Sequence, residues 1–534
     1  MVQIIIPMSG VGQRFINDGY KVPKPLIIVD DKPMIEHVTN LFPNETDVSF
    51  ICNSLHLNTT DMEKTIKGFC PTGKIYEVPL ENREGPVHAV SLIFEHIKDD
   101  EEVIVSYCDY GTMWDYVGFL KDTRDRKADG AIACYKGFHP HMLGTDNYAF
   151  LKEKDRWMEK IQEKKPFTDD KMKEYASNGT YYFKNGKTLK KYFQRLMDLK
   201  LKVKGEYYVS MVYNLMAEDQ LNVSVFEIEH MLQWGTPYDL EVYEKWSLYF
   251  KNIINPQPSF IDEINTTTIL PLAGKGSRFS KVGYVQPKPL LDINGYPMVI
   301  QAIKCLPQSK NNTFVCLKEH ITEYNLDKKI KNIYKNCTIV ELDKVTEGQA
   351  CTTELGLGVN LEDPILITAC DNGVYYDSKK YQSLIKDTDN DIIVWTFKNE
   401  TTSKQNPNMY AWLETDENDL IKKVSCKNFI EGVHNKKESH VIIGTMFFRK
   451  ARYFLEGLKK NYIKNIRTNG EFYVDDVLNQ NIKAGLKVKA FQVINYICWG
   501  TPNDYKTYNY WQKFFHKCNC HPYRKEIDIT LNKS

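Results

Sequence analysis

Two stretches of the chain have residue types and spacing that suit phosphate binding. Residues 7–26 read PMSGVGQRFINDGYKVPKPL, and residues 271–290 read PLAGKGSRFSKVGYVQPKPL. Gly10 and Gly12 follow an apolar, strand-like run; lacking side chains, they allow positive φ and let a ligand approach backbone N–H groups. Such a loop at the carboxyl end of a strand is where phosphate binds in open α/β sheets.

Each glycine loop carries two basic residues. The first stretch has Arg14 and Lys24, and the second repeats the whole set as Gly274, Gly276, Arg278 and Lys288. Prolines on both sides of Lys24 restrict its backbone and argue against a helix there. A tight glycine turn with a salt-bridged arginine is the simpler interpretation, but the identical internal spacing favours a phosphate site with a cationic clamp.

Two carboxylates follow apolar runs at matching places. Asp109 comes after EEVIVSYC, and Asp371 comes after DPILITAC. A carboxylate just past the carboxyl end of a central strand faces the same edge of the sheet as the glycine loop. The alternative role for each is a turn-capping aspartate.

Further motifs recur in the same order, which indicates duplication of a whole domain rather than a short-unit solenoid. NGTYYF is matched by IGTMFF, GEYYVSMVYN by GEFYVDDVLN, and WGTPYD by WGTPND. A stretch with two prolines and several asparagines lies between the copies and is typical of a linker. The predicted organisation is a first domain at 1–248, a linker at 249–266, a second domain at 267–516 and a polar tail at 517–534.

Strand-like apolar runs alternate with helical patterns in each copy. The pattern favours an α/β fold in which a mainly parallel sheet is covered by helices on both faces. In the first copy, the expected strands lie at 4–8, 48–53, 74–80, 103–108 and 130–135. One helix is expected at 86–97.

Composition is that of a soluble globular protein. The 534 residues are 42% hydrophobic and 26% charged, and 70 Lys and Arg balance 69 Asp and Glu. No net field therefore points to nucleic acid or a membrane as a partner. Thirteen cysteines without repeated spacing suggest reduced thiols. With no signal peptide or membrane-length apolar run, we expect a cytoplasmic location.

The combination of G-x-G-x-R with P-K-x-L resembles the sugar-phosphate nucleotidyltransferases, or NDP-sugar pyrophosphorylases. The resemblance covers both halves and is closest to the branch found in bacterial capsule and surface-polysaccharide pathways. It implies two tandem nucleotide-diphospho-sugar transferase domains of Rossmann-like fold. It also implies a reaction in which a nucleoside triphosphate and a sugar-1-phosphate give a nucleotide-sugar and pyrophosphate. Arg14, Lys24, Arg278 and Lys288 would then be the catalytic cations around the triphosphate.

The resemblance also implies a metal ion, Mg²⁺ or Mn²⁺. Asp109 and Asp371 match the family's metal-binding aspartate. The position of a second ligand is less defined, because Gln233 and Cys498 stand where relatives can carry Asp. Asp239 and Asp504 are alternative ligands, but either is equally well explained as a helix N-cap.

The substrate contacts implied by the resemblance fall into two groups. Glu84 with Gly85, and Glu347 with Gly348, resemble the loop that contacts the nucleobase, although a helix N-terminus explains them equally. Residues that resemble the family's sugar-phosphate contacts are Glu163, Lys164, Gly179 and Glu206 in the first copy, and Lys427, Gly444 and Glu471 in the second.

The second copy departs from the first on the acceptor side. Cys426 stands in place of Glu163, and Asp475 and Asp476 stand in place of Ser210 and Met211. Because the phosphate-binding residues are duplicated while the acceptor residues differ, we expect a bifunctional enzyme with two different acceptors.

Three alternatives stay open at this level. Cytidylyl transfer to a polyol phosphate or another small phosphate uses the same chemistry. One copy could instead be regulatory or structural. A nucleotide-sugar-dependent glycosyltransferase fits less well, because no D-x-D motif follows the central strand. The sequence leaves the nucleobase, the acceptor and any homo-oligomer undetermined.

Overall fold

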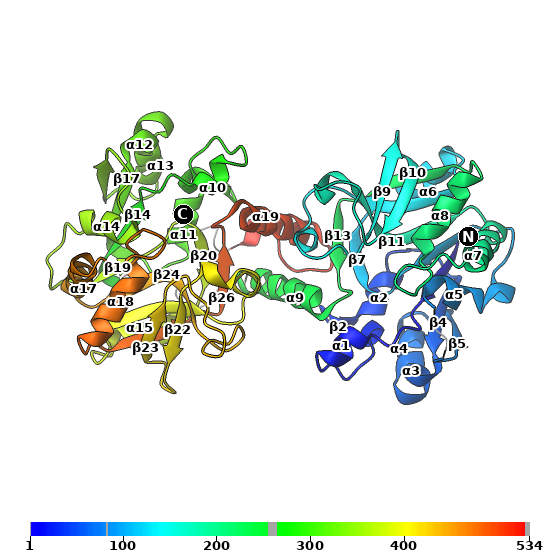
Figure 1. The fold of residues 1–534 in the computed structure, drawn as a ribbon, viewed down its shortest axis with the longest axis horizontal. Coiled ribbons are helices and arrows are strands. Elements are labelled where there is room, and N and C mark those ends of the chain that lie inside the picture. The colour runs from blue at the N-terminus through cyan, green and yellow to red at the C-terminus, as the bar shows by residue number, and fades with distance from the viewer. Residues whose placement is uncertain (1, 82–83, 255–263, 529–534) are drawn as a thin grey trace. The chain divides into compact units, whose positions relative to one another are not determined.

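The computed structural model describes residues 2–81, 84–254 and 264–528, and these form two compact units. Unit 1 holds the described residues up to Ser247 together with Lys517–His521, and unit 2 holds Leu248–His516 and the described residues from Pro522. Each unit has its own sheet, helices and core (Figure 1).

A helix crosses or reaches the predicted end of each domain, at residues 248 and 516. Helix α9 (Pro237–Asn252) continues past residue 248, strand β14 begins at Ile264, and residues 255–263 of the predicted linker lie outside the described residues. The predicted tail begins at the last residue of helix α19 (Pro502–Lys517). The limits proposed for linker and tail therefore stay predictions.

The described part of unit 1 contains a nine-stranded sheet. The expected strands of the first copy are confirmed as its parallel half. In sheet order the strands are β5 (Lys74–Val78), β4 (Val48–Asn53), β1 (Gln3–Pro7), β6 (Val103–Ser106), β11 (Tyr175–Phe183), β8 (Gly130–Tyr135), β12 (Val223–Glu227), β10 (Trp157–Glu163) and β9 (Ala149–Lys154).

The predicted α/β class is confirmed. The sheet is mainly parallel as predicted, because β5, β4, β1, β6, β8 and β12 run in one direction, but it also contains antiparallel strands. Strand β11 runs antiparallel to both of its neighbours, β6 and β8. Strands β9 and β10 form an antiparallel hairpin, which a short connection requires. The prediction rested on the parallel strands of the first 135 residues and did not anticipate the antiparallel strands β11 and β10.

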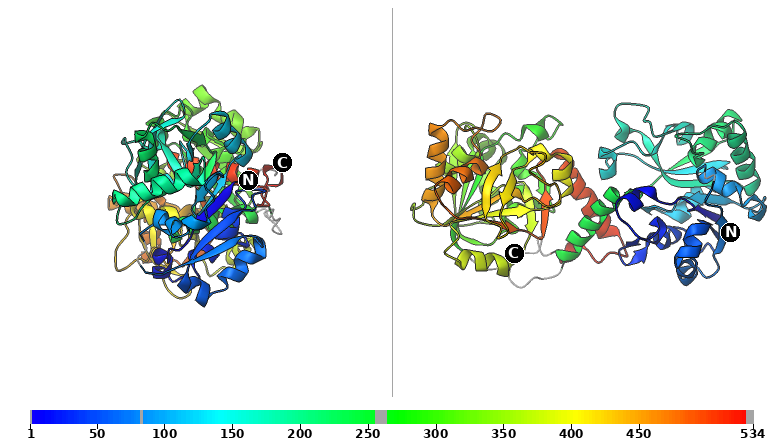
Figure 2. Two further views of the ribbon diagram at one scale, coloured as in Figure 1. Left: turned by 90° about the vertical axis from the view of Figure 1, so that its right-hand side faces the viewer. Right: turned by 60° about the horizontal axis from the view of Figure 1, so that its bottom comes forward.

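Helices cover both faces of this sheet (Figures 1 and 2). One face packs against α5 (Pro86–Ser91), α7 (Gly186–Asp198) and α8 (Val209–Glu218). The other packs against α2 (Met34–Thr39), α4 (Met62–Phe69) and α6 (Tyr116–Asp125). The helix expected at 86–97 ends at Ser91 and is followed by a 3₁₀ turn. The shorter helices are α1 (Gln13–Asn17) and α3 (Ser54–Thr59).

Unit 2 repeats the strand order of unit 1 across seven strands, and its sheet is also mixed. The strands are β18 (Cys337–Leu342), β17 (Ser309–Leu317), β14 (Ile264–Leu272), β19 (Ile365–Ile367), β24 (Val441–Phe448), β21 (Ile392–Phe397) and β25 (Val488–Gln492), with β22 (Trp412–Thr415) and β23 (Ile421–Ser425) beside them.

The helices of unit 2 again divide between two core clusters. Helices α14 (Gln349–Leu355), α17 (Ala451–Ile463) and α18 (Val474–Lys483) share one cluster, and α11 (Met298–Lys304) and α13 (Leu326–Lys331) share the other. The remaining helices are α10 (Ser277–Ser280), α12 (Lys318–Tyr324), α15 (Ser378–Lys386) and α16 (Thr401–Gln405).

Each unit also has two small antiparallel ribbons. One ribbon of each unit pairs the residue that follows the predicted metal-binding aspartate with a residue just before the WGTP motif. These pairs are Tyr110 with Gln233 and Asn372 with Cys498. The ribbons are β7 (Tyr110–Met113) with β13 (His230–Gln233), β20 (Asn372–Tyr375) with β26 (Asn495–Cys498), β2 (Ile28–Val29) with β3 (Lys32–Pro33), and β15 (Asp292–Ile293) with β16 (Tyr296–Pro297). Among the described residues, no helix combines the length and apolar character needed to cross a membrane.

Candidate active site

The glycine loop of unit 1 connects β1 to α1. Gly12 has a φ of 71°, and a Cβ atom there would lie 3.3 Å from the Cβ of Lys24. Glycine at this position therefore permits both the left-handed backbone and the close approach of the lysine. Gly10 does not use the positive φ that glycine allows, and a Cβ there would meet open space.

Lys24 forms an ion pair with Asp109, the residue predicted to bind metal. Lys24 Nζ donates to Asp109 Oδ2 at 2.7 Å, and the two side chains are 20% and 25% exposed. Burial alone would lower the pKa of Lys24, but attraction to Asp109 outweighs it, so this pKa is raised. The prolines do not exclude helix as predicted: a 3₁₀ turn spans Lys24–Leu26, because proline is tolerated in a first helical turn.

Two cavities in unit 1 share Tyr107, Asp109 and Tyr208 in their walls. The larger, of 460 Å³, is also lined by the predicted phosphate and nucleobase residues Gly10, Gly12, Lys24 and Gly85. The smaller, of 200 Å³, is also lined by Arg14 and the predicted acceptor residues Glu163, Lys164 and Gly179. The division between the cavities is incomplete, because the predicted acceptor residue Glu206 lines the larger cavity and the predicted triphosphate residue Arg14 lines the smaller one.

Glu163 is a half-buried carboxylate that accepts a hydrogen bond from one side chain. Ser210, in the first turn of α8, donates its hydroxyl hydrogen to Glu163 Oε1 at 2.5 Å. Burial raises the pKa of Glu163 to about 7, against the opposing effects of Ser210 and Lys164. A carboxyl group in this state changes charge close to neutral pH.

Two further predicted acceptor residues are joined through a tyrosine. Lys164 Nζ donates to the hydroxyl of Tyr208, which in turn donates to Glu206 Oε2. Burial lowers the pKa of Lys164. Gly179 lies beside this group with a φ of 98°, and its carbonyl accepts the backbone N–H of Tyr107 at 3.0 Å.

The predicted nucleobase loop of unit 1 is fastened to the segment that carries Glu206. The carbonyl of Glu84 accepts the N–H of Tyr207 at 2.7 Å, and a Cβ on Gly85 would lie 2.8 Å from the same nitrogen. Gly85, with a φ of 99°, is therefore required by the protein's own packing. The Glu84 carboxylate is bound by Lys202 at 2.6 Å, and its predicted contact with nucleotide stays a prediction.

Unit 2 repeats the phosphate-side geometry. Gly276 has a φ of 60°, and a Cβ there would lie 3.1 Å from the Cβ of Lys288. Lys288 Nζ donates to Asp371 Oδ2 at 2.6 Å. Burial opposes both charges, but their mutual attraction wins, so the pKa of Lys288 is raised and that of Asp371 is lowered. Arg278 is exposed, as is Arg14, and acts on Asp371 through its charge.

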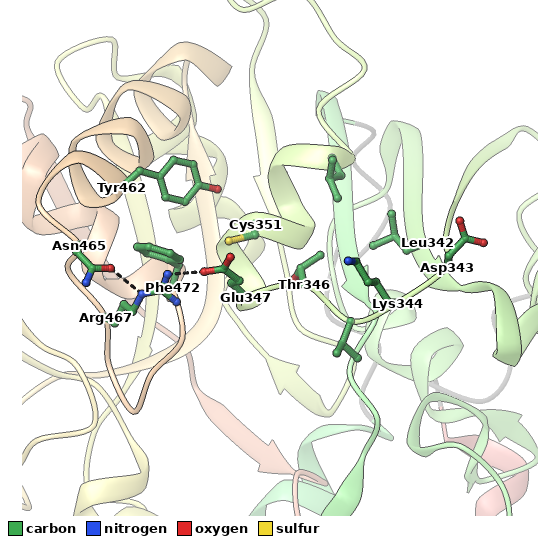
Figure 3. Close-up of a pocket in the computed structure, with 12 residues that line it drawn as sticks. Leu342, Asp343, Lys344, Thr346, Glu347, Cys351, Tyr462, Asn465, Arg467 and Phe472 are labelled. Atoms are coloured by element: carbon green, nitrogen blue, oxygen red, sulfur yellow. Dashed lines mark hydrogen bonds and ion pairs between the residues drawn. The ribbon is translucent and has the colours of Figure 1, made fainter.

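The predicted nucleobase loop of unit 2 is also fastened to a neighbouring segment, and Figure 3 shows the side chains around it. The carbonyl of Glu347 accepts the N–H of Phe472 at 2.9 Å, and a Cβ on Gly348 would lie 2.5 Å from that nitrogen. The Glu347 carboxylate is bound by Arg467, which also donates to Asn465 Oδ1 at 2.8 Å. These residues border a cavity of 790 Å³ beside the loop.

The acceptor side of unit 2 keeps a half-buried carboxylate, but on a different element. Cys426 Sγ donates to Asp475 Oδ2 at 3.8 Å, in the place where Ser210 meets Glu163 in unit 1. Burial and repulsion from Asp476 raise the pKa of Asp475 to about 6. The two departures noted in the sequence are thus one exchange, in which carboxylate and donor trade positions.

The other predicted acceptor residues of unit 2 lie around this pair. Lys427 donates to the carbonyl of Met409 at 3.3 Å, and its Nζ lies 5.0 Å from the centre of the Tyr473 ring. Gly444 has a φ of 98°, as Gly179 has in unit 1. Glu471 has an exposed side chain.

The carboxylate of Asp109 is an oxygen ligand suited to a hard divalent cation, and in this structure its Oδ2 accepts a hydrogen bond from Lys24. A Cβ on Gly235 would lie 3.0 Å from Asp109 Oδ2 and 3.1 Å from Gln233 Nε2, so carboxylate and amide face one space. Mg²⁺ is commonly held by one or two carboxylates together with substrate phosphates. The corresponding space in unit 2, over Gly500, is faced by Asp371 and the thiol of Cys498, a poorer donor for such an ion.

The alternative metal ligands sit in helix first turns but are not N-cap residues. Thr236 Oγ1 donates to Asp239 Oδ2 at 2.6 Å and accepts the Asp239 N–H at 3.1 Å. Asp504 makes the same reciprocal pair with Thr501. The N-cap interpretation is therefore wrong. The threonine is the N-cap residue, and the aspartate three residues later pairs with it in a capping box. Burial raises the pKa of Asp239 to about 6.

Sequence inspection missed two tyrosines that line both cavities of unit 1. Tyr208 had a usable signal, because GEYYV and GEFYV keep a tyrosine at the same place, Tyr473 in the second copy. Tyr107 had none, because Ala369 replaces it in the second copy.

Comparison with known proteins gives a family match for unit 1. Residues 3–230, less than half of the chain, match the family model described as nucleotidyl transferase. That span includes all nine strands of the unit 1 sheet. A comparison with curated proteins found no match.

Solved structures similar to this chain include nucleotide-handling enzymes. A nucleoside-diphosphate-sugar pyrophosphorylase from Vibrio cholerae RC9 is 22% identical over 45% of this chain and 98% of its own, with a TM-score of 0.38. An inositol-1-phosphate CTP transferase from T. maritima is 16% identical over 49% and 100%, with a TM-score of 0.37. Likenesses of this size do not by themselves indicate an activity.

Proposed function

We propose that this chain transfers a nucleoside monophosphate from a nucleoside triphosphate to a sugar-1-phosphate or a similar small phosphate, releasing pyrophosphate. The observation that carries the proposal is the pair of cavities that share Asp109. One has the glycine loop and Lys24 in its wall, and the other has Glu163 and Lys164. The nucleotidyl transferase match over residues 3–230 supports the same chemistry.

The chemistry requires positioning and charge neutralisation rather than a covalent enzyme intermediate. An oxygen of the acceptor phosphate attacks the α-phosphorus in line, the bond from that phosphorus to the bridging oxygen breaks, and pyrophosphate leaves with the electron pair. Lys24 and Arg14 offset the negative charge that accumulates there. A divalent cation on Asp109 would add to this neutralisation.

The duplicated phosphate side and the altered acceptor side support two activities with different acceptors. Lys288 and Asp371 repeat the ion pair of unit 1, whereas Cys426 and Asp475 exchange the roles of Glu163 and Ser210. A decayed second copy would not be expected to keep a half-buried carboxylate through such an exchange.

Pyrophosphate release tests the proposal. Four nucleoside triphosphates would be combined with a panel of sugar and polyol phosphates and Mg²⁺, using wild type, Asp109→Ala and Asp371→Ala. We expect each variant to lose a different substrate pair. If one variant loses all activity and the other keeps full activity, one unit is structural or regulatory. Absence of release from every pair would refute nucleotidyl transfer.

A further inference from the structure

The acceptor sides of the two units differ in polarity as well as in the position of the carboxylate. In unit 1, the hydrogen-bonding side chains that line the 200 Å³ cavity include Tyr107, Ser177, Asn178 and Tyr181. At the same places in the matching motifs, unit 2 has only apolar side chains: Ala369, Ile442, Ile443 and Met446.

The backbone geometry confirms that these positions correspond. Gly179 and Gly444 share a φ of 98° in the middle of strands β11 and β24. A Cβ on Gly179 would lie 3.1 Å from the Tyr107 side chain, and one on Gly444 would lie 3.4 Å from the Cβ of Ala369. The residue before the site Cys-Asp pair therefore faces the same glycine in both units.

Asn178 carries a donor that no described residue satisfies. Its side chain is 3% exposed and its Oδ1 accepts the N–H of Thr180 at 2.9 Å, while its Nδ2 has no partner in the described part of the chain. A buried donor of this kind is costly unless something accepts its hydrogen bond. Ile443, which is 5% exposed, makes no such demand.

We infer that the acceptor of unit 1 is a polyhydroxylated phosphate, and that the acceptor of unit 2 is a phosphate monoester of similar reactivity whose body carries fewer hydroxyl groups. The inference rests on the proposed function and names the acceptor class of each unit. The replacement of Gln233 by Cys498 beside the site aspartate adds to the loss of polar contacts in unit 2.

Unit 2 is not wholly apolar at this place, because Asp475 takes over the carboxylate that Glu163 supplies in unit 1. Unit 2 keeps the half-buried carboxylate of Asp475 at the start of α18, next to the buried Asp476, whereas unit 1 carries Glu163 at the end of β10. Both units therefore keep a carboxylate at this place, supplied by a strand in unit 1 and by a helix in unit 2.

The expected acceptor selectivity follows from a difference between polar and apolar binding sites in how strongly they reject the wrong ligand. A site built to hydrogen-bond a hydroxyl group rejects an analogue that lacks it strongly, because its own polar groups are left unpaired; an apolar site rejects an added hydroxyl more weakly. We therefore expect unit 1 to lose roughly 10²- to 10⁴-fold in kcat/KM when the contacted hydroxyl is removed. Unit 2 should prefer the less hydroxylated acceptor by about 10- to 100-fold.

The full chain tests this with each unit assayed separately. Asp371→Ala reports unit 1, and Asp109→Ala reports unit 2. Pyrophosphate release would be measured with hexose 1-phosphates, their monodeoxy derivatives and cyclohexyl phosphate, which keeps the ring and lacks all other hydroxyls. Opposite orders of preference in the two units are the expected result.

Reciprocal substitutions test whether the side chains at positions 178 and 443 determine the acceptor preference of each unit. Ile443→Asn should shift unit 2 toward hydroxylated acceptors by about tenfold or more, and Asn178→Ile should do the reverse in unit 1. Asn178→Ile also removes the hydrogen bond to Thr180. If that variant fails to fold, Ile443→Asn still decides, because the Ile443 side chain is apolar and makes no hydrogen bond that the substitution would break. Nucleotide binding by each variant serves as the folding control.

The outcomes separate this inference from the proposed function. If both units release pyrophosphate and both prefer the hydroxylated acceptors, the inference is wrong while nucleotidyl transfer stands. Release by unit 1 with no acceptor accepted by unit 2 also overturns it. Absence of release from both units overturns the two together.

Discussion

Glu163→Gln should stabilise the protein at alkaline pH while impairing acceptor use. Burial raises the pKa of Glu163 from its ordinary value of 4.5 to about 7, so the folded state favours the protonated carboxyl. Stability from this group is fully present below pH 4.5 and is lost as pH rises through 7. Glutamine keeps the acceptor oxygen for Ser210 without the charge.

The size of the effect follows from the pKa change. A difference of this size corresponds to about 3 kcal/mol between the two protonation states. Because the side chain is partly exposed, solvent screening reduces the expected gain to about 2 kcal/mol at pH 8. For a unit of this length, that gain raises the midpoint of thermal unfolding by roughly 4–8 °C.

The assay is calorimetric unfolding of wild type and Glu163→Gln at pH 5 and pH 8. We expect a difference at pH 8 and almost none at pH 5. Glu159→Gln is the matched control, because Glu159 lies on the same strand with an exposed side chain. An equal shift at both pH values, or an equal shift in the control, would refute the burial argument.

Three further predictions concern unit 1. Lys24→Met leaves Asp109 unpaired and should cost about 2–3 kcal/mol of unfolding free energy across neutral pH, measured by urea denaturation; because the pKa of Lys24 is raised, the pair's contribution should vanish only at alkaline pH. Lys202→Met should raise KM for the nucleoside triphosphate a few-fold with little change in stability, measured by steady-state kinetics; an unchanged KM would deny the loop a positioning role. Gly85→Ala should destabilise by at least about 2 kcal/mol, because its Cβ would meet backbone atoms at a positive φ; a variant as stable as wild type would contradict that packing.

The sequence alone determined which residues gather at the phosphate side of each unit. Repetition of the glycine loop, Lys24 and Asp109 in a second copy distinguished them from ordinary turn residues. Because the carboxyl ends of parallel strands lie along one edge of a sheet, their order in the chain was enough to place them together. Their direct contact at 2.7 Å, across 85 positions of the chain, was not visible in the sequence.

Local patterns were also insufficient where an element's direction depends on distant partners. The antiparallel course of β11 between β6 and β8 depends on hydrogen bonds to strands far away in the chain. Apolar alternation identifies a strand but does not indicate which way its neighbours run.

The tertiary structure decided how the departures in the second copy are to be understood. In the sequence, Cys426 in place of Glu163 and Asp475 in place of Ser210 are two separate departures from the first copy. In the structure they form one pair, 49 positions apart, that corresponds to Glu163 with Ser210. A spacing pattern records each side chain separately, whereas burial and hydrogen bonding depend on which side chains meet, and only the folded chain brings these two together.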